Sequence, residues 1–400
     1  MSHYRFLPRI PTRIGKLGIV LFFTSLSAAF VGSIISIYVN SFVNNESIVG
    51  FIFTALVLVS IIANFMIIPL VESRSKKKLF IYAGALTALG YFAYSIINNF
   101  KIFILIAVCV TILTSMRIAA AGLLIEHSSN KRNLSKNEGL MYTFINLAWV
   151  IGPLIVGLIL AKLDVLKYIF LLSSGLMIIA VILFVFFRIN YSGKRKKLDS
   201  HPLKNFKDFF KNKHRVKAYV LSGGVNLWWG LIFIYMPLLI IKNLSDSWVG
   251  FFLFFTTVPL IFLEYYFGSL ASRRGYKKIF LWGYLIPAAA AIISFFFFSN
   301  IWIIIIALSL ASIGLSMIEG TTEAYFFDIL KPREDQRFYS PYNTAVDAGN
   351  LFGEFIPAII LLFLPFKSIF LFYAICMLTL GFLSLNIKNV FESKRKAGKF

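Results

Sequence analysis

Ionisable side chains inside long apolar runs are the residues of this sequence that could do chemistry. Five carboxyl groups lie in such runs: Glu264, Glu319, Glu323, Asp347 and Glu354. A charge in hydrocarbon costs on the order of 3 kcal/mol or more, so these residues are candidates for function. Burial favours the neutral form of a carboxyl group, which would let it bind and release a proton. The five acids outweigh one arginine, Arg117, and this balance favours protons or cationic solutes over anions.

The spacing of the acids forms two pairs. Asp347 and Glu354 are seven residues apart, about one helix face, and are the best candidates for a site near the middle of the membrane. Glu319 and Glu323 are four apart and also share a face, but they lie nearer the end of their run. We expect them to serve a gate or an ion pair rather than to bind substrate. Glu264 is a further candidate for proton coupling.

Arg117 lies deep in its own apolar run. About 15 residues separate it from the outer end of that run, a depth of about 22 Å in a helix. We therefore expect it to point inward, toward an acidic partner, rather than to reach the membrane surface. Proton coupling and a purely structural ion pair remain open as its role.

A polar-aromatic segment is the best candidate for a substrate cavity. Asn226, Trp228, Trp229 and Tyr235 combine apolar area with hydrogen-bonding tips, as a cavity for amphipathic organic solutes requires. Trp149 is a fifth candidate. The alternative is that such aromatic side chains face lipid or the membrane interface.

Motifs for catalysis are missing from the sequence. There is no P-loop for ATP, and no His or Cys pair has the spacing of metal ligands. Cys109 and Cys376 lie in apolar runs and form no disulfide framework. We expect neither an enzyme nor a bound metal or cofactor, and a proton gradient as the source of energy.

The composition indicates an integral membrane protein. Of 400 residues, 59% are hydrophobic and only 14% are charged, which is too little polar surface for a soluble globule. The net charge of +23 comes from Lys and Arg in short gaps between apolar runs, so it does not indicate nucleic-acid binding.

Twelve apolar runs are long enough to cross about 30 Å of hydrocarbon as helices, and they lack the period-2 alternation of a barrel. They are 15–40, 47–71, 79–97, 102–125, 140–160, 165–187, 219–241, 247–271, 279–298, 301–330, 339–363 and 368–385. Most of the 40 Lys and Arg residues lie at the two termini and in the even-numbered gaps. This predicts a multi-pass plasma-membrane protein with both termini in the cytoplasm.

The runs repeat with a period of half the chain. Residues 46–51 match residues 246–251, and the pair at 77–78 matches that at 277–278. We predict an all-α fold of two pseudo-symmetric six-helix bundles, residues 1–188 and 218–400, joined by a basic cytoplasmic linker, 189–217. Phenylalanines at 206, 209 and 210 favour a linker helix on anionic headgroups, and a solvated basic loop is the alternative.

The turn after the eighth run resembles the cytoplasmic hairpin motif of the major facilitator superfamily, Gly-x-Leu-Ala-Asp-Arg-x-Gly-Arg-Arg. The matching residues are Gly268, Leu270, Ala271, Arg273, Gly275 and Lys277. Ser272 stands where the acid belongs. In the first copy Glu72 stands at the position of the acid and Ser75 at that of the glycine. Lys76 and Lys77 stand at the positions of the basic pair.

The resemblance covers essentially the whole chain and implies a transporter that works by alternating access, with both hairpins latching the cytoplasmic side. It implies that Glu72 faces the start of the eleventh run, near Ser340 and Pro341. The gate candidates are Glu72, Arg74, Lys77, Gly268, Arg273, Arg274, Gly275, Lys277, Glu319 and Glu323.

The fifth run resembles the helix-kink motif of the family's antiporters at Gly152, Pro153 and Gly157, with Ala148 and Val156 in place of two glycines. Close helix packing and a proline kink are the general alternative. Arg117 with Gly122 is similar to the family's proton-coupling Arg-x-x-Gln-Gly segment, without its Gln.

Together these features predict a drug:proton antiporter-like exporter of lipophilic or cationic small molecules. The second hypothesis is a uniporter or symporter of a small organic solute or lipid-like molecule, and the third is a non-transporting receptor or scaffold. The expected partners are a small-molecule substrate and the lipid bilayer, with no nucleic acid, and the expected state is a monomer.

Overall fold

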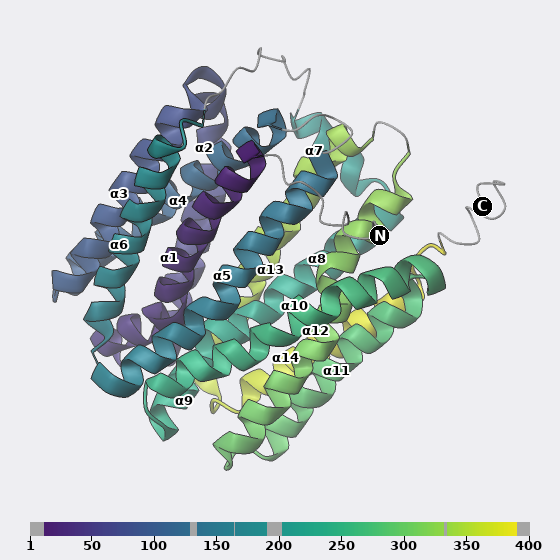
Figure 1. The fold of residues 1–400 in the computed structure, drawn as a ribbon. Coiled ribbons are helices and arrows are strands. Elements are labelled where there is room, and N and C mark those ends of the chain that lie inside the picture. The colour runs from purple at the N-terminus through teal and green to yellow at the C-terminus, as the bar shows by residue number, and fades with distance from the viewer. Residues whose placement is uncertain (1–11, 129–133, 164, 190–201, 332–333, 390–400) are drawn as a thin grey trace, which may run out of the picture. The chain divides into compact units, whose positions relative to one another are not determined.

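The computed structural model describes residues 12–128, 134–163, 165–189, 202–331 and 334–389. Every regular element within these ranges is a helix (Figure 1). The first six are α1 (Thr12–Val43), α2 (Glu46–Ser73), α3 (Lys76–Ile96), α4 (Phe100–Ser128), α5 (Leu134–Leu163) and α6 (Leu166–Phe186). The others are α7 (Pro202–Phe210), α8 (Lys213–Gly230), the π-helix η1 (Leu231–Tyr235), α9 (Met236–Asn243), α10 (Ser247–Arg274), α11 (Tyr276–Phe296), α12 (Ile301–Ile329), α13 (Asp335–Phe363) and α14 (Ser368–Leu385).

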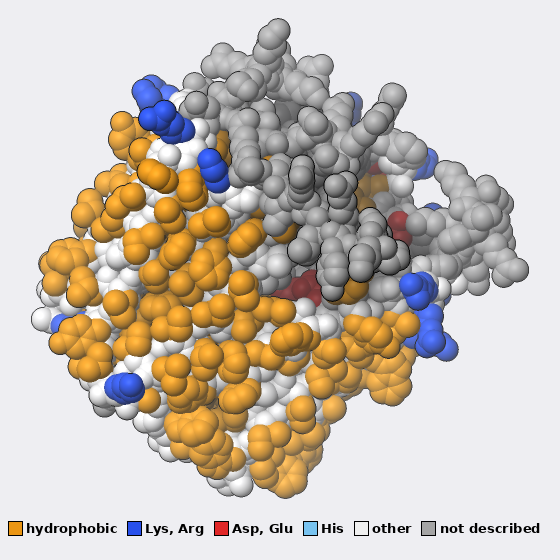
Figure 2. Space-filling model, in the orientation of Figure 1, with side chains coloured by type: hydrophobic (Ala, Val, Ile, Leu, Met, Phe, Trp, Pro, Cys, Tyr) orange, Lys and Arg blue, Asp and Glu red, His pale blue; other side chains and the backbone are white. Residues whose placement is uncertain are grey.

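Within the described ranges, twelve helical segments are long and apolar enough to cross a membrane, with α8, η1 and α9 together forming one of them. The predicted all-α membrane fold with twelve transmembrane helices is confirmed. Large side chains such as Met66 and Phe262, each 73% exposed, cover these helices with apolar surface. On the face shown in Figure 2, hydrophobic side chains cover most of the described surface, as contact with lipid requires.

The predicted repeat is visible in matching elements. Helices α3 and α11 both have 21 residues, and their bounds differ by 200 positions. Asn99 at the start of α4 and Asn300 at the start of α12 make the same cap, in which the side-chain oxygen accepts the N–H groups of the second and third residues that follow. The two copies therefore share their local structure as well as their sequence pattern.

The described helices belong to two compact units, residues 1–34 with 58–196, and residues 35–57 with 197–400. The predicted domain bounds at 188 and 218 stay predictions. In the first unit, Phe80 packs on Phe184 with ring centroids 4.5 Å apart. The hydroxyls of Ser27 and Ser173, 2.9 Å apart, show how small residues let α1 and α6 approach.

In the second unit, α8 and α13 cross at glycines. A Cβ at Gly349 would collide with the backbone carbonyl of Gly223, and one at Gly353 would lie 2.5 Å from the carbonyl oxygen of Leu227. Only residues without a side chain allow the two backbones this close.

The described part of the linker, α7, packs onto the second unit. Phe209 is fully buried between the rings of Tyr219, Phe326 and Phe338. The expected linker helix is thus found, and the alternative of a solvated loop is wrong for these residues. Phe209 packs on the protein itself, whereas Phe210 is 45% exposed, so contact of this helix with lipid headgroups stays a prediction.

Charged contacts at α7 accompany this packing. Arg337 on α13 donates hydrogen bonds to Asn205 and Asp208. A hydrogen bond from Lys211, together with the charges of Lys211 and Arg337, lowers the pKa of Asp208 below its ordinary value.

Candidate functional site

Three acidic side chains meet inside the second unit. Glu264 on α10 lies so close to α12 that a Cβ at Gly320 would collide with its carboxylate. Glu264 interacts electrostatically with both Glu319 and Glu323 of α12. The spacing of four in α12 puts Glu319 and Glu323 on the face that α10 covers. The structure thus brings together three acids that the sequence had placed in separate roles.

The cluster lies well inside the membrane-spanning helices. Glu264 precedes the end of α10 at Arg274 by ten residues, and Glu319 precedes the end of α12 at Ile329 by ten. At 1.5 Å per residue both lie about 15 Å from those ends, at one level. Glu323 lies one turn nearer to the end of α12.

Polar aromatic side chains complete the cluster. The indole of Trp229 on α8 lies beside the carboxyl group of Glu319, and the hydroxyl of Tyr339 on α13 lies beside that of Glu323. Tyr342, one turn further along α13, lies beside Ser222, and its buried hydroxyl forms no hydrogen bond with any described residue. Helices α8, α10, α12 and α13 all contribute to this site.

Basic partners are absent from the described surroundings of these acids. None of the ion pairs formed within the described ranges involves Glu264, Glu319 or Glu323. The buried Oε2 atom of Glu319 accepts no hydrogen bond from any described residue. The ion pair expected for Glu319 and Glu323 is therefore not found there. Such carboxyls can take up a proton or attract a cation.

Glu354 forms a second acidic position in the same unit. Its side chain is 7% exposed, and its Oε2 atom has no hydrogen-bond partner among the described residues. Asp347, two turns earlier on α13, is half-buried and forms no ion pair within the described ranges. Both remain candidates for proton coupling.

A proline interrupts the backbone hydrogen bonds of α13 beside Glu354. Pro357 has no N–H, so the carbonyl of Gly353 loses its usual helical partner. Tyr373 of α14 donates its hydroxyl to that carbonyl at 2.6 Å, and Tyr235 donates to the carbonyl of Glu354. Side chains thus satisfy backbone groups that the proline disturbs, as a membrane interior requires.

Two predicted cavity residues are packing residues in this structure. Trp228 is 1% exposed and packs edge-on against Tyr373, and Tyr235 is fully buried at the end of the π-helix. Asn226 donates to the carbonyl of Ser222 in its own helix. Trp229 alone of this segment contacts an acid of the cluster. π-Helices are frequent at functional sites, and this one begins two residues after Trp229.

The candidates in the first unit lie elsewhere. Arg117 is 5% exposed, which agrees with an inward direction, but the acidic partner expected for it is not found, since it forms no ion pair with any described residue. Its electrostatic neighbour is Tyr91. Trp149 packs over Gly32, where an added Cβ would lie 3.0 Å from the ring.

The helix-kink residues Gly152, Pro153 and Gly157 are all buried in α5. A Cβ at Gly152 would lie 2.7 Å from that of Ala29, so this glycine lets α1 and α5 approach closely. This contact is the packing role that the sequence left as the general alternative.

The two hairpin copies have a glycine or a serine at the same position because the backbone conformation there differs. Gly275, between α10 and α11, has φ 87°, a conformation that favours glycine, whereas Ser75 in the first copy has φ −68°. Arg74, Arg273 and Arg274 are exposed. Gly268 has open space around it, and Lys277 is half-buried. The side chain of Glu72 lies outside the described residues, so its contact with the eleventh span stays a prediction, as do the gate roles of this group.

Some residues of the site were missed in the sequence. Tyr339 and Tyr342 stood at the predicted end of a span, where aromatic residues usually mark the interface. The segment from Gly353 to Pro357 did contain a signal, because a proline four residues on frees a carbonyl that needs a donor such as Tyr373.

Comparisons with known proteins agree on one family. The family model described as Major Facilitator Superfamily matches residues 17–263 and 224–399. An uncharacterized MFS-type transporter of Methanocaldococcus jannaschii is 23% identical over 373 residues, which are 92% of this chain and 95% of the relative.

Solved structures share the fold. The nucleoside transporter NupG superposes with a TM-score of 0.73 at 12% identity, covering 94% of this chain and 98% of that one. A peptide transporter POT in complex with sulfate gives a TM-score of 0.74 at 13% identity, covering 95% of each chain.

Proposed function

The chain belongs to the major facilitator superfamily and is a multi-pass membrane transporter of that type, and from this premise we propose that it exports lipophilic cations in exchange for protons. The observation that carries the proposal is the cluster of Glu264, Glu319 and Glu323, which has no basic partner among the described residues. Protons and organic cations can compete for such carboxyls.

Trp229 supports the choice of substrate. Its ring lies beside Glu319, so an organic cation there would meet both a carboxylate and an aromatic ring. Aromatic faces attract cations by about 1 kcal/mol or more when water is excluded. We assign this cluster to substrate and proton, and Glu354 and Asp347 to proton coupling.

The proposed cycle is alternating access, in which the two repeats rock about a site near the membrane midplane. The two hairpins close the cytoplasmic side. We place both termini in the cytoplasm, following the distribution of Lys and Arg. The protein acts as a monomer of the plasma membrane, uses the proton gradient and needs neither a cofactor nor a nucleic-acid partner.

A uniporter or symporter of a small organic solute is the second candidate. The observation in its favour is that Gly152 has a packing role and that Ala148 and Val156 replace glycines of the antiporter motif. A receptor or scaffold on the same fold is the third candidate.

Ethidium transport in proteoliposomes with an imposed pH gradient tests these candidates. We expect accumulation by the wild-type protein, and its loss in Glu354→Gln, Asp347→Asn and Glu319→Gln. Downhill exchange should survive in Glu354→Gln and Asp347→Asn, because those changes remove coupling alone. Glu46→Gln, a carboxyl at the start of α2, is the matched control and should transport normally.

The three candidates give different results in that experiment. Downhill movement that ignores the pH gradient would indicate a uniporter. Unchanged gradient-driven accumulation in all three variants would remove these acids from coupling. A scaffold would move no ethidium, and a cysteine placed beside Asn226 would then react from one side of the membrane only.

A further inference from the structure

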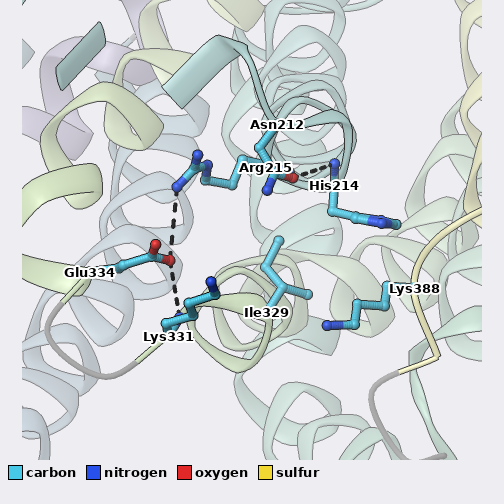
Figure 3. A pocket seen from close by; sticks show the side chains of 7 residues that line it. All are labelled: Asn212, His214, Arg215, Ile329, Lys331, Glu334 and Lys388. Atoms are coloured by element: carbon cyan, nitrogen blue, oxygen red, sulfur yellow. Dashed lines mark hydrogen bonds and ion pairs between the residues drawn. The ribbon is translucent and has the colours of Figure 1, made fainter. Parts of the chain in front are cut away.

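A basic pocket of about 290 Å³ lies in the second unit, apart from the acidic cluster (Figure 3). Its charged lining consists of His214 and Arg215 from the first turn of α8, Lys331 and Glu334 between α12 and α13, and Lys388 after α14. Three permanent cations and a histidine thus face one carboxylate. Neither proton coupling nor export uses these residues.

The first turn of α8 is fixed in place. The side-chain oxygen of Asn212 accepts the N–H groups of His214 at 2.9 Å and Arg215 at 3.4 Å. Arg215 also stacks on the ring of Phe338 at 3.8 Å and donates to the carbonyl of Asp208 at 2.9 Å. These contacts hold the first turn of α8 in place as one wall of the pocket.

The single carboxylate of the pocket is already engaged. Glu334 forms an ion pair of 3.8 Å with Arg215 and accepts the backbone N–H of Lys331 at 3.0 Å, as the dashed lines of Figure 3 show. Among the described residues, no carboxylate therefore pairs with Lys331 or Lys388.

Two nitrogen atoms in the pocket lack partners among the described residues. Nδ1 of His214 and Nε of Arg215 are buried and form no hydrogen bond with any described residue. The charged neighbours that act on His214 are Lys213, Lys217 and Lys388, all of them basic. A surplus of positive charge with unused nitrogen atoms is the surrounding that an anion requires.

We propose that this pocket binds a phosphate group, with Lys331 and Lys388 as point charges and the first turn of α8 as a further positive end. Phosphate groups bind at helix N-termini beside Lys and Arg for this reason. The group can belong to an anionic lipid headgroup or to free phosphate.

The position of the pocket favours the lipid. Helix α12 has 29 residues, and the pocket lies just beyond its end. The length of α12, about 43 Å, matches the thickness of a bilayer including both headgroup layers. The pocket beyond its end therefore lies at headgroup level. A bound phosphate would connect α8 with the segments after α12 and α14.

The test uses the full chain in nanodiscs. Thermal unfolding is followed by tryptophan fluorescence in phosphatidylcholine discs, in discs containing phosphatidylglycerol, and in phosphatidylcholine discs with inorganic phosphate. Retained phosphatidylglycerol is counted by native mass spectrometry. We expect a higher midpoint and retained lipid with phosphatidylglycerol, and on the order of tenfold weaker binding in the double variant Lys331→Gln/Lys388→Gln.

The matched control is Lys204→Gln/Lys207→Gln, which removes two exposed charges of α7 outside the pocket. It should keep the response to phosphatidylglycerol. A shift with inorganic phosphate alone would support the site and identify free phosphate as its ligand. An equal loss of binding in both double variants, or no response to either probe, would overturn the proposal.

Discussion

The hydroxyl of Tyr373 donates a 2.6 Å hydrogen bond to the carbonyl of Gly353, the backbone group that Pro357 leaves without a partner. Removing that hydroxyl leaves a buried acceptor in an apolar interior. We expect Tyr373→Phe to lower the free energy of unfolding by about 1 to 3 kcal/mol. Reversible unfolding in mixed micelles, followed by tryptophan fluorescence, measures the loss.

Pro357→Ala provides the control for this hydrogen bond, because it restores a backbone N–H to the helix. In that background Tyr373→Phe should cost less, by about 1 kcal/mol. Equal costs in the two backgrounds would show that the hydroxyl does not serve the freed carbonyl.

The glycine crossing of α8 and α13 predicts a steric effect. Gly349→Ala would drive a methyl group into the carbonyl of Gly223, backbone against backbone. We expect a loss of about 2 kcal/mol or more in the free energy of unfolding. In the control Gly175→Ala the added methyl meets no atom within 4 Å, so stability should stay or rise by up to about 1 kcal/mol. Equal effects would contradict the close crossing.

The proximity of the Trp229 indole to the carboxyl group of Glu319 predicts a pH-dependent emission. Excitation moves electron density of the indole away from its nitrogen, so an ionised carboxylate there stabilises the excited state. We expect the Trp229 emission to move to longer wavelength as pH rises and Glu319 loses its proton. The difference spectrum between wild type and Trp229→Phe isolates this signal.

Glu319→Gln is the control for the emission experiment. It keeps a hydrogen-bond acceptor but has no proton to lose in this range. The pH response of Trp229 should disappear in this variant, and its persistence would assign the response to another group.

The docking of the linker helix should weaken in acid. A hydrogen bond from Lys211, with the charges of Lys211 and Arg337, lowers the pKa of Asp208 below its usual 3.8. Because the folded pKa is depressed, the contribution of Asp208 to docking is present above the usual pKa and is lost as pH falls through the folded one. A spin label at Lys207→Cys, with both native cysteines replaced by serine, should become mobile only below about pH 4.

Asp208→Asn separates this carboxylate from other groups that titrate in acid. The label should already be more mobile at neutral pH in this variant, because the charged contacts to Lys211 and Arg337 are gone. A pH profile identical to that of the parent would show that Asp208 does not hold α7.

The sequence by itself determined the fold and the list of candidate acids. Apolar runs of membrane length admit only helices or closed barrels, and the repeat at about 200 residues predicted two equivalent halves. The acids could be recognised because a charge in hydrocarbon has a high free energy, and this holds without knowledge of the residues around it. These properties depend only on residue type and on spacing along the chain.

Only the tertiary structure decided which of those residues act together. Glu264 and Glu319 are 55 positions apart, yet α10 and α12 bring them to one level beside Trp229 of α8. Trp228, the neighbour of Trp229, is instead buried against Tyr373. A helix turns by about 100° per residue, so which neighbour meets an acid depends on how helices pack. That packing is set by contacts such as Gly223 on Gly349, which no single segment contains.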